Sequence, residues 1–517
     1  MYNKGPFADW VPKPLMLLLI ILFLFPILGV SGVFSNNMGD ISGVMGAYTE
    51  HITMVNNAAT IGMMLAMPIL MRVKMRFRTK EIMVTCCVTL AALVLMCGTT
   101  HNYAVFVAGN LLIGFFKMFA TLEIVIVVMF ILSPTGDRKQ FYSIFYPIAI
   151  GSSSLMFYYL SDLIFDYGIT SAYYLIAAIM LGLAVLSLIF QHNQRFSFKM
   201  PLYQVDWLSM LLLTVSFMCM NYALVFMRQQ NWLNSLSIQW TLIVSILTFI
   251  WLVVRQKGKK RPFIDFSGFK LSSVKHSMIL LIFLGFYLSS TSVFMQWNMG
   301  ALGYNSLVNA KLGLWGLPGL ILGGILGGIG FKKEWNIKYF ILMGFGAFFL
   351  HSLLIYLTIQ PNMNIEMFYL PVMLRNFGMV ILFIGIWFYA TNSLPAMASL
   401  GVIGILLAYR TFLVTGIAGA VMGFGSYQMQ LQSLTDMSNY WDINLMGPAA
   451  IRGYGSMQIG ALLASGKTMM GWLCWLFIPV ALFILNHSYG KMNFRKWSLF
   501  RKKIKGNDEE GYRLDIN

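Results

Sequence analysis

The chain of 517 residues is 58% hydrophobic and only 10% charged, with a formal net charge of +18 and a mean hydropathy of +0.72. Soluble domains contain about 25% charged residues, so this composition excludes a soluble enzyme or binding module and predicts an integral membrane protein. The five cysteines lie within apolar runs and the six histidines are scattered, which predicts neither disulfide bonds nor a metal site.

Fourteen apolar runs are long enough to cross a bilayer, which requires about 20 residues. In chain order they fall near 14–35, 51–71, 81–99, 103–132, 141–164, 171–191, 206–226, 237–254, 276–296, 306–331, 337–358, 366–389, 397–425 and 466–487. The first run is too long for the apolar core of a signal peptide and no cleavage site follows it, so we expect it to remain as a membrane helix. The sequence therefore predicts an all-α membrane protein with 14 transmembrane helices.

The distribution of basic residues predicts the orientation. Of the 36 lysines and arginines, 29 fall on the side of both termini, 4 on the opposite side, and 3 within spans: Lys117, Arg375 and Arg410. Cytoplasmic loops carry the excess of Lys and Arg, so we expect both termini to be cytoplasmic. Because the basic residues gather on one side of the membrane, we expect them to contact anionic lipid and expect no nucleic-acid partner.

Small-residue spacing and prolines predict how some helices pack. Gly319, Gly323 and Gly327 recur at four-residue spacing, which is typical of a face where two membrane helices approach closely. Pro147 and Pro318 lie inside apolar runs and predict kinks.

Five short strings carry a resemblance to a known family. They are "MPILMRVKMRFRTKEIM" (67–83), "VDWLSMLLLTVSFMCMNYAL" with "QNWLNS" (within 205–235), "RPFIDFSGFK" (261–270), "MQWNMGALGYNSLVNAKLGLWGLPGLILG" (295–323) and "AYRTFLVTGIAGA" (408–420). In this order and spacing they resemble the major facilitator superfamily, and within it the fourteen-helix drug:proton antiporters of the EmrB/QacA type. The first string keeps Arg76 and Lys80 of the superfamily's basic loop, to which the resemblance assigns a gating role.

The resemblance implies two six-helix bundles at 1–192 and 263–490, two additional helices at 193–262, and a basic cytoplasmic tail at 491–517. It implies a secondary transporter of the bacterial cytoplasmic (inner) membrane that exports small amphiphilic molecules by alternating access, using the proton gradient and no cofactor. Relatives in Gram-negative bacteria work with a periplasmic adaptor and an outer-membrane channel. We expect that contact at the external segment 425–465, whose sequence suits either a surface helix or a solvated loop.

The predicted fourth helix carries two charges within its apolar run, Lys117 and Glu123. A charge at the bilayer centre costs about 3 kcal/mol on insertion scales. Six residues rotate a helix by about 600°, so the two side chains point about 120° apart and do not form a neutralising pair. Each therefore needs a partner on another helix, or water in a central cavity.

We expect Glu123 to carry the coupling proton, because a buried carboxylate changes its protonation with its surroundings. The alternative is a structural ion pair with a cation on a neighbouring helix. The arginine of the family's helix-four motif aligns with Asn110, and Lys117 lies two turns further in as a candidate cavity cation. The alternative for Lys117 is a lysine bound to backbone carbonyls.

Four other polar residues are candidates for the substrate cavity. Arg375 and Arg410 lie on the predicted twelfth and thirteenth helices, and repeated bundles around a midplane site would turn both inward. For Arg375, an ion pair near the membrane surface explains the residue equally well. Asn56 and Asn57 on the second helix either bind a ligand or donate hydrogen bonds to another helix.

Three other functions remain compatible with this sequence. One is a flippase for lipids or lipid-linked oligosaccharides, and another is an uptake symporter, although the Glu-x-x-Glu-Arg pattern of peptide symporters is absent from helix one. The third is a membrane-embedded transferase, which would need clustered His or Asp side chains at one membrane face. The sequence does not name the substrate, although the excess of candidate cavity cations over acids favours anions.

Overall fold

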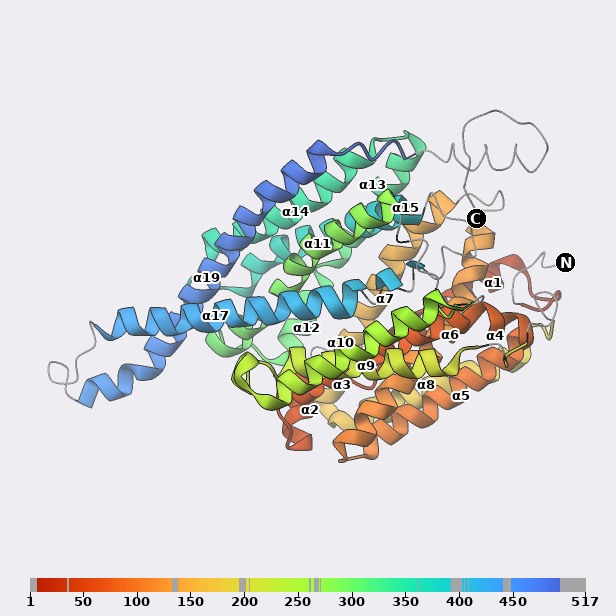
Figure 1. The fold of residues 1–517 in the computed structure, drawn as a ribbon, viewed down its shortest axis with the longest axis horizontal. Coiled ribbons are helices and arrows are strands. Elements are labelled where there is room, and N and C mark those ends of the chain that lie inside the picture. Colours follow the sequence, from red (N-terminus) through yellow and green to blue (C-terminus); the bar gives the residue numbers. More distant parts are fainter. Residues whose placement is uncertain are drawn as a thin grey trace.

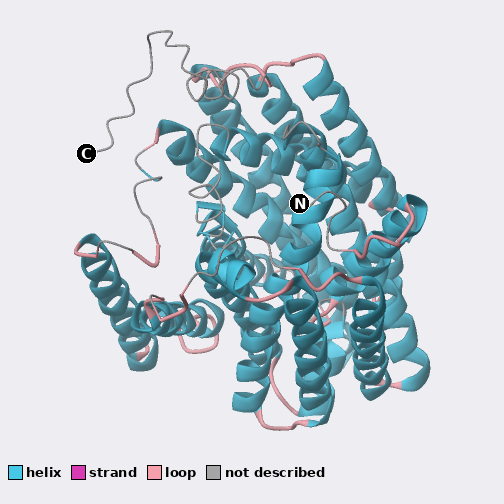
Figure 2. Ribbon diagram, turned by 90° about the vertical axis from the view of Figure 1, so that its right-hand side faces the viewer, coloured by secondary structure: helices cyan, strands magenta, loops and turns pink. Residues whose placement is uncertain are grey.

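The computed structural model is built from helices, with no named strand in the part that it describes (Figures 1 and 2). The described residues are 7–34, 37–132, 138–194, 201–203, 205–259, 262–264, 269, 271–361, 363–391, 402–403, 405–407, 409–439 and 448–492. Within them, 13 helices are long and apolar enough to cross a membrane, and the first helix is a shorter apolar one. This agrees with the predicted all-α membrane protein of about fourteen spans.

Six long helices form the first bundle. They are α1 (Lys13–Gly29), α3 (Thr49–Ala66), α5 (Thr79–Thr99), α6 (Tyr103–Leu132), α7 (Arg138–Tyr167) and α8 (Ile169–Phe190), with the short helices α2 (Met38–Met45) and α4 (Leu70–Arg76) before and after α3. We call the face where α1 begins and α19 ends the inner face, following the predicted orientation, and the opposite one the outer face. The helix predicted over 14–35 ends at Gly29, where the backbone of Val30 becomes extended.

The second bundle consists of later helices that pack on one another. They are α11 (Ser272–Gln296), α12 (Ser306–Leu314), α13 (Leu317–Lys332), α14 (Ile337–Thr358), α15 (Tyr369–Thr391), α17 (Thr415–Ser438) and α19 (Pro448–Asn486). The run predicted over 306–331 is divided into α12 and α13, and Pro318 lies in the first turn of α13. Two π-helical segments, Trp297–Ala301 and Tyr409–Val414, continue α11 and precede α17.

The segment near 425–465, which we expect to be external, is helical over 425–438 and 448–465. Helix α17 runs on to Ser438 and α19 begins at Pro448, so each extends past the neighbouring helices, on the left of Figure 1. At 39 residues α19 is about 58 Å long, well beyond the roughly 30 Å of a hydrocarbon core. The two helices stay together beyond the bundle, with Met437 against Gly460.

The two bundles meet along α7, which packs on α12, α13 and α15. Near the outer face, Ser306 Oγ donates to Asp40 Oδ2 over 2.9 Å. Near the inner face, Tyr142 Oη and Thr391 Oγ1 share a hydrogen bond of 3.2 Å. The bundles are therefore joined towards both faces in this conformation.

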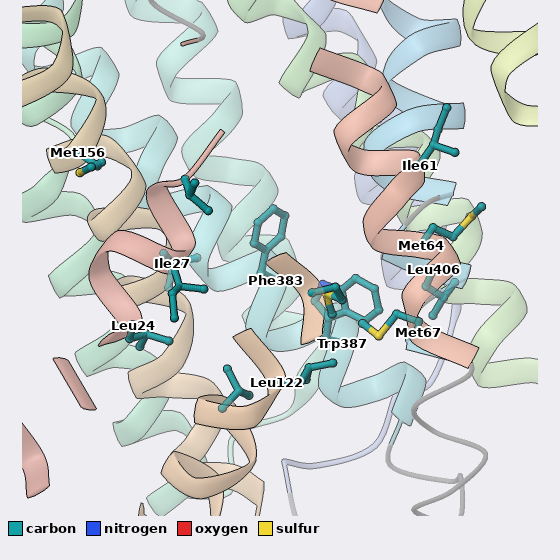
Figure 3. Packing of buried hydrophobic residues seen from close by; sticks show 14 of the residues in the cluster. Leu24, Ile27, Ile61, Met64, Met67, Leu122, Met156, Phe383, Trp387 and Leu406 are labelled. Atoms are coloured by element: carbon teal, nitrogen blue, oxygen red, sulfur yellow. The ribbon is translucent and has the colours of Figure 1, made fainter. Parts of the chain in front are cut away.

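Apolar side chains of both bundles gather in one buried cluster (Figure 3). It includes Leu122 from α6, Met64 from α3, and Phe383 and Trp387 from α15.

Glycines permit the closest helix contacts within each bundle. A Cβ on Gly114 of α6 would lie 1.8 Å from the carbonyl oxygen of Ala59 in α3, and one on Gly62 would lie 1.9 Å from that of Leu111. In the second bundle, a Cβ on Gly319 would lie 2.1 Å from the Met373 carbonyl oxygen in α15. Gly323 and Gly327 face Val380 and Ile384 of the same helix, which confirms the predicted packing face.

We expect Gly114→Ala to destabilise the protein by about 1–3 kcal/mol, because the added methyl group forces α3 and α6 apart. Gly182→Ala in α8 is the matched control, since nothing lies within 4 Å of its Cβ position and alanine favours helix by about 1 kcal/mol. Thermal unfolding of the purified protein in detergent measures both. Equal melting temperatures for the two variants would contradict the close α3–α6 contact.

Helices α9 (Trp207–Phe226) and α10 (Leu236–Lys257) are the additional pair. Helix α9 packs on α3 of the first bundle and on α17 of the second, while most of α10 is exposed. Ser216 and Ser245 join the pair by donating to each other's carbonyl oxygens over 2.9 and 2.8 Å.

The inner end of this pair is held by Asp206, which caps α9. Its carboxylate accepts from the Ser209 backbone N–H and hydroxyl and forms ion pairs with Lys259 at 2.7 Å and Arg255 at 3.2 Å. Burial by itself raises the pKa of Asp206, but the hydrogen bonds from Lys259, Ser209 and Arg255 outweigh it and hold this pKa below its ordinary value. The carboxylate thus joins α9, the end of α10 and the linker beyond it.

Because the folded-state pKa of Asp206 is depressed, its stabilising contribution is present above the unfolded pKa of about 3.9 and is lost as pH falls towards the folded value. We expect Asp206→Asn to lower the melting temperature by a constant amount between about pH 5 and 8. The difference from wild type should shrink below about pH 4. A difference that instead grew on acidification would contradict the assigned ion pairs.

Candidate functional site

Glu123 of α6 is buried against a cation from another helix. Its carboxylate forms an ion pair with the ammonium of Lys74 in α4, and both side chains are only 4% exposed. Thr79 at the start of α5 also accepts from Lys74 Nζ, over 3.4 Å. The structure therefore has the neighbouring-helix ion pair that the sequence offered as the alternative to a proton carrier at Glu123.

The pair lies towards the inner face. Glu123 is about 20 residues, or about 30 Å, beyond the outer end of α6 at Tyr103. Lys74 belongs to the short helix that follows α3, on the same side. Burial at this depth makes the pair unlike an exposed surface salt bridge, because removing one partner leaves an uncompensated charge inside the protein.

Lys117 binds backbone carbonyls at the point where α1 ends. Its Nζ donates to the carbonyl oxygens of Leu28 over 2.8 Å and Val30 over 2.7 Å. The last carbonyls of a helix lack intrahelical partners and carry partial negative charge. Lys117 thus stabilises the end of α1 and joins it to α6.

As the helical rotation predicts, Lys117 and Glu123 do not pair with each other. Each finds its partner on a different element, Lys117 at the end of α1 and Glu123 on α4.

The predicted asparagines bind other parts of the first bundle and the additional pair. Asn57 Nδ2 donates to Asn221 Oδ1 in α9 over 2.9 Å, and Asn221 Nδ2 donates to the Met54 carbonyl oxygen over 2.9 Å. This interhelical contact is one of the two roles expected for Asn57. Asn56 is half-buried on α3.

Asn110 of α6 is fully buried. Its side chain packs against Gly32, which belongs to the segment that follows α1. Its Nδ2 donates to the Phe106 carbonyl oxygen over 3.2 Å.

The two interior arginines make no ion pair with any residue that the structure describes. Arg375 donates to Thr291 Oγ1 of α11, and Arg410 donates to the neighbouring Thr411 Oγ1 over 3.2 Å. The sequence holds no Asp or Glu between Glu366 and Asp436, so both lie on a stretch of chain without local counter-charge.

The loop residues named by the resemblance, Arg76 and Lys80, take no part in the Lys74–Glu123 ion pair. Arg76 is exposed at the end of α4. Lys80 Nζ donates to the Leu188 carbonyl oxygen near the end of α8, over 2.8 Å. The buried cation of this loop is instead Lys74, which sequence reasoning missed because five lysines and arginines lie between 72 and 80.

No model of a known protein family and no curated protein sequence matches the chain. Solved structures do. A POT family transporter in complex with a thioalcohol-conjugated peptide matches with a TM-score of 0.59 and 13% identity, over 93% of this chain and 98% of that one. The nucleoside transporter NupG matches with 0.53 and 14%, over 91% and 99%. The human organic anion transporter MFSD10 (TETRAN) matches with 0.51 and 13%, over 90% and 98%.

The chain has the major facilitator fold. In this fold it is a multi-pass membrane protein, and the candidate cavity residues Asn110 and Lys117 lie on α6, Arg375 on α15 and Arg410 in the segment before α17.

We expect Glu123→Gln and Lys74→Met each to destabilise the protein by about 3–5 kcal/mol. Each substitution removes one charge and leaves the other buried without its partner. The double variant should recover most of this loss. Arg78→Gln is the control, because the Arg78–Glu81 pair is 42% and 45% exposed and should cost less than about 1 kcal/mol. Thermal unfolding measures the series, and simple addition of the two single effects would contradict a coupled pair.

Proposed function

We propose that this protein is a secondary active transporter of the bacterial inner membrane that exports small amphiphilic molecules by alternating access, coupled to inward proton movement. The observation that carries the proposal is the buried Lys74–Glu123 pair near the inner face of a major facilitator fold. Among the described acidic side chains within membrane helices, Glu123 is the one that is fully buried.

A buried ion pair can store one proton. With Glu123 ionised, its charge cancels that of Lys74 and holds α4 against α6. When the carboxylate takes up a proton, the attraction ends and a net positive charge is left between the two helices. This costs free energy in a poorly solvated site, so protonation favours a different arrangement of α4 and α6. A proton then biases the equilibrium between two conformations, as alternating access requires.

Lys117 connects that event to the first helix. It binds the end of α1 from the same helix that carries Glu123. Movement of α6 therefore pulls on the carbonyls of Leu28 and Val30, next to the glycine-flanked segment that follows α1. We assign Lys117 this positioning role in proton coupling.

The two joints between the bundles are the gates in this proposal. Breaking the Asp40–Ser306 hydrogen bond opens the outer face, and breaking the Tyr142–Thr391 hydrogen bond opens the inner face. The Tyr142–Thr391 bond joins two neutral hydroxyls, and such bonds contribute about 0.5–1.5 kcal/mol net. The Asp40–Ser306 bond joins a hydroxyl to a carboxylate, and bonds to charged groups contribute about 1.5–3 kcal/mol. Substrate binding or one proton is enough to shift a balance of that size.

The solved structures support transport of small solutes. The matched proteins are described as peptide, nucleoside and organic anion transporters. The narrower assignment to drug:proton antiporters of the EmrB/QacA type is supported by the fourteen spans and by the five strings quoted above. The projecting ends of α17 and α19 are the surface on which we propose that a periplasmic adaptor docks.

The test uses proteoliposomes with an imposed proton gradient and a panel of anionic, cationic and neutral amphiphiles. We expect the gradient to drive transport of at least one of them, accompanied by proton flux measured with a trapped pH dye. Glu123→Gln should abolish gradient-driven transport while it retains exchange of labelled for unlabelled substrate, and Arg78→Gln should behave as wild type.

Two outcomes would overturn the proposal. Full proton-driven transport by the Lys74→Met, Glu123→Gln double variant would show that the pair is only structural. Chemical conversion of a substrate without its movement across the bilayer would favour the transferase.

A further inference from the structure

The guanidinium of Arg410 is only partly hydrogen-bonded and lies where the two bundles meet. It lies in the π-helical segment Tyr409–Val414, which contacts α3 of the first bundle and α11 and α17 of the second. Such π-helical turns are rare and often occur at functional sites. Its Nη2 donates to Thr411, while its Nε is buried without a hydrogen-bond partner among the described residues.

The positive charge of Arg410 has no carboxylate opposite it in the described part of the chain. Among the described residues of the membrane helices, Glu123 is the one fully buried carboxylate, and it is already paired with Lys74. The guanidinium instead lies over the ring of Phe383, with Cζ 4.2 Å from the ring centre. A cation–π contact contributes about 0.5–2 kcal/mol, which does not replace an anion for a buried charge.

The Phe383 ring belongs to a cluster of aromatic rings from both bundles. Phe383 of α15 meets Tyr146 of α7 edge-on, with ring centres 5.8 Å apart. Tyr146 in turn lies nearly parallel to Tyr142, with ring centres 6.0 Å apart. Tyr146 and Phe383 are each about eight residues, or about 12 Å, from the inner ends of their helices. The rings therefore lie directly behind the inner gate formed by Tyr142 and Thr391.

We propose that Arg410, Phe383 and Tyr146 form a binding site for a planar aromatic anion. The carboxylate or sulfonate of the ligand accepts from Nε and one Nη of Arg410, the two-pronged geometry that guanidinium groups favour. The ligand ring packs against Phe383 and Tyr146, where aromatic pairs contribute beyond simple burial. This inference names a substrate class for the proposed transporter, so it rests on the proposed function and deepens it.

The geometry also couples binding to the conformational cycle. Tyr146 belongs to the first bundle, whereas Phe383 and Arg410 belong to the second, so the site is complete only while the bundles are in contact. Release to either side separates the ring of Tyr146 from the guanidinium.

Binding is measured by equilibrium dialysis of the purified full-length protein with three probes of similar size. These are 2-naphthoate, its neutral analogue 2-naphthamide, and the saturated anion decahydro-2-naphthoate. We expect 2-naphthoate to bind most tightly, and Arg410→Gln to weaken its binding about 10- to 100-fold, the range for a charge-assisted hydrogen-bonded pair. Phe383→Leu should reduce the preference for 2-naphthoate over the saturated anion.

Arg228→Gln is the matched control, because Arg228 is an exposed arginine 5.5 Å from the ring centre of Tyr427, at the outer end of α9. It should leave all three affinities unchanged. Arg410→Lys keeps the positive charge but cannot donate two parallel hydrogen bonds to one carboxylate, so it should give an intermediate affinity. This variant keeps the test possible if Arg410→Gln fails to fold.

Equal binding of the acid and the amide, or wild-type affinity in both Arg410 variants, would overturn the site. Arg410-dependent binding of 2-naphthoate without any transport in proteoliposomes would confirm the site and overturn the proposed function instead. Transport of other amphiphiles without any binding of 2-naphthoate would support the proposed function and overturn the site.

Discussion

The carboxylate of Glu123 and the ammonium of Lys74, buried against each other between α6 and α4, are the constraint on which the proposed mechanism depends. Leaving either charge in a closed protein interior without the other costs about 3–5 kcal/mol. Their pairing fixes α4 beneath the inner end of the first bundle and makes the packing there sensitive to a single proton. The other interior cations are compensated differently, Lys117 by the carbonyls at the end of α1 and Arg375 by a threonine hydroxyl.

Most of the fold could be predicted from the sequence because the length of each apolar run is a local property. The interruptions could not. Helix α1 ends at Gly29 within an apolar run, and α12 ends and α13 begins at Trp315–Gly316. Hydropathy does not predict these interruptions, because it measures transfer into lipid and carries no information on backbone conformation. The same limit applies to 425–465, whose polar composition suggested a surface helix or loop, although α17 and α19 continue as helices into it.

The site was predictable only one helix at a time. The rotation of about 120° between Lys117 and Glu123 correctly implied separate partners, since helical geometry fixes angles along a single helix. Which cation would face Glu123 depends on how α4 folds back under α6, and nothing local distinguishes Lys74 from the four other basic residues near it. The Asn57–Asn221 and Asp40–Ser306 hydrogen bonds join segments far apart in the chain. They could not be predicted without knowing how the helices pack.

The central claim is that Glu123 changes its protonation during the transport cycle. Infrared difference spectroscopy of the protein in lipid, recorded on changing pH and on adding a transported substrate, observes this directly through the carbonyl stretch of a protonated carboxyl group. The account predicts a protonated-carboxyl band that appears and disappears in the pH range where transport is proton-driven, shifts with substrate, and is missing in Glu123→Gln. A spectrum without such a band, or one that Glu123→Gln leaves unchanged, would contradict it.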